Sequence, residues 1–203
     1  MKDINATVIV DLTPNEEEIM KNLDKDARWG IKKAIKNNLI VEETNKEEDL
    51  KEFYKIYEKE LKEKIIRVET FEHLKENMDI LFVCKKDNKI IAGATLKIKN
   101  NIPTLTRNAS LKEYLSFHPN NLLYWNLILW SKKNGYKKLD LGGYQIKPRG
   151  NLIGINKFKE RWGEIVYYYD DYPFYKAIGR KLIRNFGFFW WLNKKMKRKI
   201  RRK

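Results

Sequence analysis

The stretch from Leu139 to Gly163, LDLGGYQIKPRGNLIGINKFKERWG, constrains this chain more than any other part of its sequence. An apolar strand stops at Asp-Leu-Gly-Gly (140–143), a loop holding Arg149 follows, and a short basic helix carries Phe158 and Lys159. Paired glycines let a backbone approach a ligand where side chains would block it. A cationic helix facing such an opening suits an anionic substrate or a developing oxyanion. On spacing alone, a strand, a turn and a surface helix explain the pattern equally well.

The net charge of +16 is unevenly distributed along the chain. Residues 172–203 contain twelve Lys or Arg and no Asp or Glu, whereas residues 1–171 contain 31 basic and 27 acidic residues. Only a small positive excess therefore belongs to the body of the protein. We expect one domain over residues 1–171, followed by a basic aromatic tail over residues 172–203.

The tail has the composition of an interfacial membrane helix. Apolar residues recur every four positions from Phe174 to Phe186, and the apolar run 186–192 is too short to span a bilayer. Aromatic rings enter the headgroup layer while Lys and Arg meet anionic lipid, so we predict an amphipathic helix on an anionic membrane surface. Two alternatives remain, packing on the domain and binding of nucleic acid. The predicted membrane contacts are Arg184, Phe188, Phe189, Trp190, Trp191, Lys194, Lys195 and Arg198.

The body shows alternating helix and strand patterns. We expect Thr13 to cap a helix that begins at Pro14, and Ile35 to point inward from a second helix over 26–37. Asp87-Asn88 signals a hairpin between two strands. Together these patterns predict an α/β fold, with a mixed, mostly antiparallel sheet flanked by helices. The predicted strands are 8–10, 39–43, 80–86, 89–99, 104–108, 138–141 and 165–169. The predicted later helices are 47–64, 70–77, 120–134 and 153–161.

Four motifs follow one another in a distinctive order. They are Arg-Trp-Gly-Ile-Lys-Lys-Ala at 28–34, the run 118–125 before a helix that ends near Gly135, Asp-Leu-Gly-Gly at 140–143, and the run 154–163. This order resembles the FemA/FemB/FemX family over residues 7–171. Members are acyltransferases with the GNAT fold, and they attach amino acids from aminoacyl-tRNA to peptidoglycan precursors. The resemblance therefore implies a GNAT-like fold and an aminoacyltransferase of cell-wall synthesis.

The resemblance implies attack by an acceptor amine on the ester of an aminoacyl-tRNA. Lys159 matches the lysine of the family's Phe-Lys motif, and we expect it to stabilise the tetrahedral intermediate or grip a phosphate. Asp140 is placed to orient the amine or accept its proton. A surface lysine and a turn-capping aspartate are the plain alternatives. The further candidates for substrate contact are Gly142, Gly143, Tyr144, Arg149, Lys157, Phe158, Arg161 and Trp125.

The chain departs from the family in having one such domain where members usually pair two. A homodimer or another partner is one way to supply the missing half of the cleft. We expect no metal or cofactor, because the sequence has no metal-ligand pattern. It also lacks the Gln/Arg-x-x-Gly-x-Gly/Ala loop with which ordinary GNAT enzymes hold acetyl-CoA.

Two other functions stay open, namely N-acyl transfer from acetyl-CoA or another thioester, and a non-catalytic adaptor that binds membrane or RNA. The start, Met1-Lys2-Asp3-Ile4, has no apolar signal-peptide core. We therefore expect a cytoplasmic protein that lies peripherally on the inner face of the cell membrane.

Overall fold

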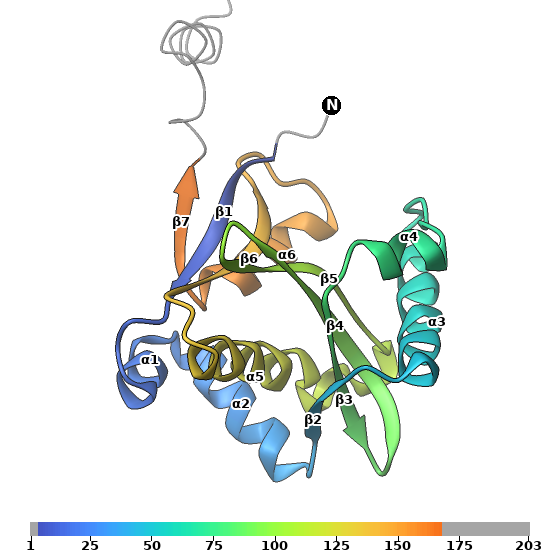
Figure 1. Ribbon diagram of the computed structural model, residues 1–203, viewed down its shortest axis with the longest axis horizontal. Coiled ribbons are helices and arrows are strands. Elements are labelled where there is room, and N and C mark those ends of the chain that lie inside the picture. Colours follow the sequence, from blue (N-terminus) through green and yellow to red (C-terminus); the bar gives the residue numbers. More distant parts are fainter. Residues whose placement is uncertain (1–3, 168–203) are drawn as a thin grey trace, which may run out of the picture. The chain divides into compact units, whose positions relative to one another are not determined.

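A seven-stranded mixed sheet with helices on both faces makes up the body of the protein (Figure 1). The computed structural model describes residues 4–167. The predicted tail over residues 172–203 and its membrane contacts lie outside the described residues and stay predictions. Within residues 4–167, every helix is too short or too polar to cross a bilayer.

The pairs β2–β3, β3–β4, β4–β5 and β6–β1 are antiparallel, whereas β5–β6 is parallel. The order of the sheet is β2-β3-β4-β5-β6-β1-β7. β5 and β6 run parallel and share one registered pair, Thr104 opposite Asp140. This weakly paired junction lies in the middle of the sheet, so it is the natural place for the two strands to separate. The strands are β1 (Ile4–Asp11), β2 (Ile40–Thr44), β3 (Ile80–Lys86), β4 (Lys89–Lys99), β5 (Ile102–Ser110), β6 (Lys138–Gln145) and β7 (Glu164–Tyr167).

Alternate side chains of the strands enter two separate cores. Phe82 and Cys84 of β3 pack with α1, α2 and α5 on one face, whereas Leu81 and Val83 pack with α3 and α4 on the other. Figure 1 shows α5 and α3 on the two sides of the strands. The helices are α1 (Glu16–Asn22), α2 (Lys25–Lys36), α3 (Glu47–Glu63), α4 (Phe71–Glu76), the 3-10 helix η1 (Lys112–Phe117), α5 (Pro119–Lys133) and α6 (Asn151–Glu160).

The predicted hairpin is confirmed, because β3 and β4 are joined at Asp87 and Asn88 with φ of 48° and 61°. The predicted start of the first helix is wrong. Asn15 caps α1 in a capping box with Glu18, while Thr13 donates its hydroxyl hydrogen bond to Asp11 instead. The inward position of Ile35 is also wrong, since this side chain lies 57% exposed near the end of α2.

The predicted stop of the strand at the paired glycines is the third error. β6 continues past Gly142 and Gly143 to Gln145 and pairs with β1 along its length. Three steps along β6 face two along β1 in this region, which is a β-bulge. Gly142 has a φ of +74°, a backbone conformation that favours glycine, so it bends the strand without ending it.

Candidate active site

A cavity of about 1070 Å³ lies between α3, β5, η1, β6 and α6. It begins where β5 and β6 separate beyond their single registered pair. Its wall carries more basic than acidic side chains, and although Lys59, Lys64 and Arg107 have carboxylate partners, the remaining positive excess favours an anionic ligand. The basic residues are Lys59, Lys64, Arg107, Lys112 and Lys159, and the acidic ones are Glu60 and Glu63.

Both strands that line the cavity are bulged at it. In β5, Thr95 pairs with Arg107 and Leu96 with Leu105, so Thr106 is the extra residue. In β6, the bulge falls at Leu141 and Gly142. Bulges re-aim side chains and are common beside active sites. The two bulges therefore shape the opening between the strands.

Glycine is required at position 142 because the Leu105 carbonyl of β5 leaves no room for a side chain. A Cβ at this position would lie 2.7 Å from the carbonyl oxygen of Leu105 and 3.8 Å from Nζ of Lys159. Backbone atoms cannot yield as a flexible side chain can. Gly142 and Gly143 both line the cavity, and their predicted use, letting the backbone approach a ligand closely, stays a prediction.

Lys159 reaches into the cavity from α6. Its ammonium donates to the carbonyl oxygens of Gly142 at 3.2 Å and Gly143 at 3.0 Å. Burial lowers its pKa from 10.5 to about 8, although the charge of Asp140 acts in the opposite direction. A lysine in this state holds a proton at neutral pH and can release it under mildly alkaline conditions.

Asp140 lies behind the cavity wall, because it is not among the residues that line the cavity. Its carboxylate accepts hydrogen bonds from the Thr7 hydroxyl and from the N–H of Gly142, the latter at 2.7 Å. It therefore fixes the turn of the backbone at the bulge and supplies negative charge near Lys159. Direct proton transfer from an acceptor amine is not the role that this placement favours.

The remaining predicted contacts divide clearly. Phe158 lines the cavity and packs edge-on against Tyr124, with ring centroids 5.0 Å apart. Arg149 and Lys157 are exposed. The last three also lie outside the cavity wall: Tyr144 donates to Glu160, Arg161 forms an ion pair with Asp26, and Trp125 packs against the core.

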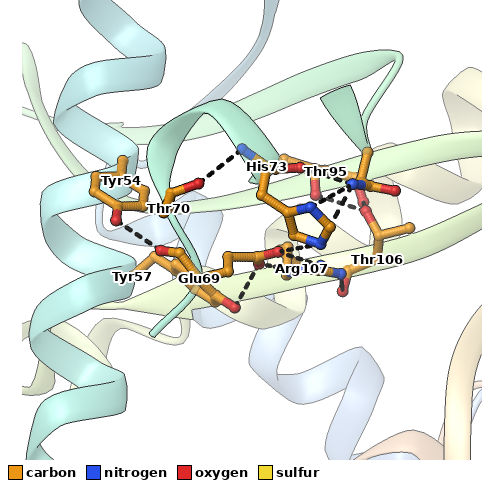
Figure 2. Close-up of polar contacts among 9 residues, drawn as sticks. Tyr54, Tyr57, Glu69, Thr70, His73, Thr95, Thr106 and Arg107 are labelled. Carbon is orange, nitrogen blue, oxygen red and sulfur yellow. Dashed lines mark hydrogen bonds and ion pairs between the residues drawn. The ribbon is translucent and has the colours of Figure 1, made fainter. Parts of the chain in front are cut away.

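Several residues of the cavity wall escaped the sequence analysis. Arg107 on β5 forms an ion pair with Glu69, and Figure 2 shows the pair together with Tyr57. Asn108 and Asn120 form a polar group at the start of α5, where the Asn108 amide donates to Asn120 at 3.2 Å. The sequence signal that could have indicated these cavity residues was the pair of polar side chains, Arg107 and Asn108, inside a strand pattern.

Within residues 4–167, no group of three His, Cys, Asp or Glu side chains is placed to hold a metal ion. No protein-family model matches this chain, and no curated protein matches it. Solved structures do match. FemX superposes with a TM-score of 0.71 at 15% identity, over 80% of this chain and 60% of FemX. The chain has the fold of FemX.

Two further solved structures share this fold. The C-terminal domain of a putative lysylphosphatidylglycerol synthetase from Agrobacterium fabrum has a TM-score of 0.58 at 14% identity, covering 80% of this chain and 57% of that one. L-PGS from Bacillus licheniformis gives the same score and identity over 86% of this chain and 63% of that one. The chain thus spans about three fifths of each match, and the predicted mixed, mostly antiparallel sheet flanked by helices is confirmed.

Proposed function

We propose that the cavity is the active site of an acyltransferase that moves an amino acid from aminoacyl-tRNA to an amine of a cell-wall precursor. The observation that carries this proposal is the position of Lys159. The lysine of the Phe-Lys motif lies in the opening between β5 and β6, held by two carbonyls of the Asp-Leu-Gly-Gly motif. The Fem-like fold and the basic cavity support the same reaction class.

In the proposed reaction, the acceptor amine attacks the ester carbonyl carbon of the aminoacyl-tRNA. A C–N bond forms, the ester C–O bond breaks, and the terminal hydroxyl of the tRNA leaves with a proton while the amine loses one. The ester is already activated, so alignment and charge stabilisation are the protein's main contributions.

Lys159 is the group we assign to the oxyanion of the tetrahedral intermediate. An ammonium has three N–H donors, and the carbonyls of Gly142 and Gly143 take two of them. Among the described contacts this leaves one donor for a substrate oxygen. Asp140 assists from behind, because its charge favours the protonated form of Lys159.

The connection between β5 and α5 bears on the choice of donor. It forms the 3-10 helix Lys112–Phe117 and contains no glycine from Leu111 to His118. A glycine-rich turn is what brings backbone N–H groups up to a pyrophosphate. We therefore place aminoacyl-tRNA ahead of acetyl-CoA as donor.

The acceptor follows from the fold's two kinds of neighbour. FemX supports the amine of a cell-wall precursor, and the two lysylphosphatidylglycerol synthetase structures support phosphatidylglycerol as the competing acceptor. With phosphatidylglycerol the attacking group would be a glycerol hydroxyl, so a new ester C–O bond would form in place of the C–N bond. Either would be met at the inner face of the cell membrane.

The test is transfer of labelled amino acids from a mixed pool of charged tRNAs to two acceptors, lipid-linked cell-wall precursor and phosphatidylglycerol. Lys159→Ala is compared with Lys133→Ala, which removes an exposed lysine from the end of α5. Transfer that needs Lys159 but not Lys133 supports the proposal. A parallel assay offers acetyl-CoA as the donor. Transfer from acetyl-CoA alone would favour the thioester alternative, and no transfer from either donor would favour the non-catalytic adaptor.

A further inference from the structure

Arg107 is the cavity's second deeply placed cation, and the reaction proposed above does not use it. The bulge at Thr106 alters the register of β5 at Arg107, and the side chain lines the cavity with 26% of its surface accessible. Its Nε and Nη2 donate to the two carboxylate oxygens of Glu69, and its Nη1 donates to the carbonyl oxygen of Thr106 at 2.8 Å. The guanidinium is thus fixed in plane and direction.

Glu69 is itself held by the helices beside it (Figure 2). The hydroxyl of Tyr57 donates to its carboxylate at 2.8 Å, and the hydroxyl of Tyr54 donates to its backbone carbonyl at 2.7 Å. His73 lies 3.5 Å from the same carboxylate. Burial and the neighbouring Glu69 raise the pKa of Tyr57 to about 12, so Tyr57 remains a donor at physiological pH. The whole network orients one arginine.

If Arg107 served only to hold the α3–α4 connection against the sheet, its ion pair with Glu69 would be enough. That role would not need an arginine on a bulged strand at the wall of a basic cavity. Arg107 lies two residues along β5 from Leu105, whose carbonyl oxygen faces Gly142 beside Lys159. Arg107 and Lys159 both line the same cavity of about 1070 Å³, so one substrate can reach both cations.

We propose that Arg107 binds a phosphate group of a substrate in this cavity, and that Glu69 and Tyr57 are the residues that position it. The inference rests on the proposed function in one respect, that this cavity holds the substrates. Glu69 and the Thr106 carbonyl take three of the five guanidinium N–H donors, which leaves one on Nη1 and one on Nη2 in the same plane for phosphate oxygens. Both substrates carry such a group, the tRNA terminus as a phosphodiester and the acceptor as a precursor or lipid phosphate.

The test measures equilibrium binding of two soluble probes to the full chain, without any acyl transfer. One probe is the trinucleotide CCA, and the other is dihexanoyl phosphatidylglycerol below its micelle concentration. Arg107→Gln should weaken binding of one probe at least about tenfold. The affected probe identifies the source of the phosphate. The control is Lys97→Gln on β4, which breaks the ion pair between Lys97 and Asp79 outside the cavity wall. This variant should leave the affinity for both probes within about twofold of wild type.

Two further variants separate recognition from stability. Arg107→Lys keeps a positive charge beside Glu69 but loses the planar arrangement of donors. Its thermal stability should therefore be closer to wild type than that of Arg107→Gln, while its probe binding should stay weak. Tyr57→Phe removes one hydroxyl and should weaken binding a few-fold in a folded protein. Wild-type affinity in both Arg107 variants, or a wild-type protein that binds neither probe, would overturn the inference. Arg107-dependent binding without transfer would refute the proposed function alone.

Discussion

Arg107 and Lys159 line the same cavity, yet the fold treats their charges in opposite ways. Arg107 has a carboxylate partner, and its ion pair with Glu69 raises its pKa further above an already high value. Lys159 has two backbone carbonyls, and burial lowers its pKa to about 8. One cation is permanently charged, and the other is close to releasing its proton.

The difference indicates a division of labour. A permanent, planar, oriented charge suits a group that is anionic throughout the reaction, such as a phosphate. An ammonium that is costly to keep charged gains most when negative charge develops beside it, as on a tetrahedral intermediate. We therefore assign phosphate binding to the α3 side of the cavity and stabilisation of the tetrahedral intermediate to the α6 side.

Removing Lys159 should have the largest effect on the reaction. Lys159→Ala deletes the proposed oxyanion donor, and loss of one such donor lowers kcat about 100-fold or more. Steady-state transfer assays measure this, with circular dichroism as a check on folding. If the lost kcat were less than about threefold, the chemistry would have to be assigned elsewhere in the cavity.

A methyl group at Gly142 should damage both sides of the comparison. Gly142→Ala is strained at a φ of +74° and meets the Leu105 carbonyl oxygen at 2.7 Å. We expect a loss of about 2 kcal/mol in unfolding free energy together with reduced transfer. Chemical denaturation measures the loss of stability, and Gly154→Ala is the matched control for stability alone, because its Cβ would enter open space although Gly154 also lines the cavity. Equal stability of the two variants would contradict the close approach.

Neutralising Glu69 should act on the binding side and on stability. Glu69→Gln leaves the guanidinium of Arg107 without its charged partner, at a cost of about 2 kcal/mol, less than for fully buried pairs because both side chains are partly accessible. The ion pair and the Tyr57 hydrogen bond lower the pKa of Glu69 below its ordinary value of 4.5. Its contribution is therefore present above about pH 4.5 and lost as pH falls through the folded pKa. Thermal melts of both proteins between pH 3 and 7 test this, and a stability gap that persists unchanged at pH 3 would exclude it.

Neutralising Asp140 should have the smallest effect, because Asn keeps an oxygen that can accept from Thr7 and Gly142 and removes only the charge near Lys159. Because the carboxylate raises the pKa of Lys159, Asp140→Asn should move the alkaline fall in transfer rate to lower pH. We expect the rate at pH 7 to change less than about tenfold, since the carboxylate does not line the cavity. A pH–rate profile gives the answer. A loss as large as that of Lys159→Ala would restore Asp140 to a direct role in proton transfer.

Local signals predicted much of the fold. The hairpin at Asp87-Asn88 and the strands on either side of it follow from adjacent residues, and the structure has them with the predicted bounds. The glycines and Lys159 were found in the same way, because one short segment carries them. The fold class then followed from the order of such segments.

Long-range contacts explain what the sequence could not reveal. Arg107 acquires its direction from a bulge set by register with β4 and from Glu69, which lies 38 residues earlier in the chain. Asp140 was placed correctly beside the glycines, but the hydroxyl that occupies its carboxylate belongs to Thr7 on the neighbouring strand. Such partners are decided by strand pairing, which composition and spacing do not specify.

The most direct test of the contrast between the two cations is an NMR titration of the lysine side chains, with Lys159 assigned from the signal that disappears in Lys159→Arg. The account predicts that this ammonium titrates near pH 8. In that case the unfolded chain binds more protons than the folded one between about pH 8 and 10.5, so the stability of the wild type rises with pH relative to Lys159→Met. Titration near 10.5, with no such rise, would contradict a lysine prepared for charge that develops during transfer.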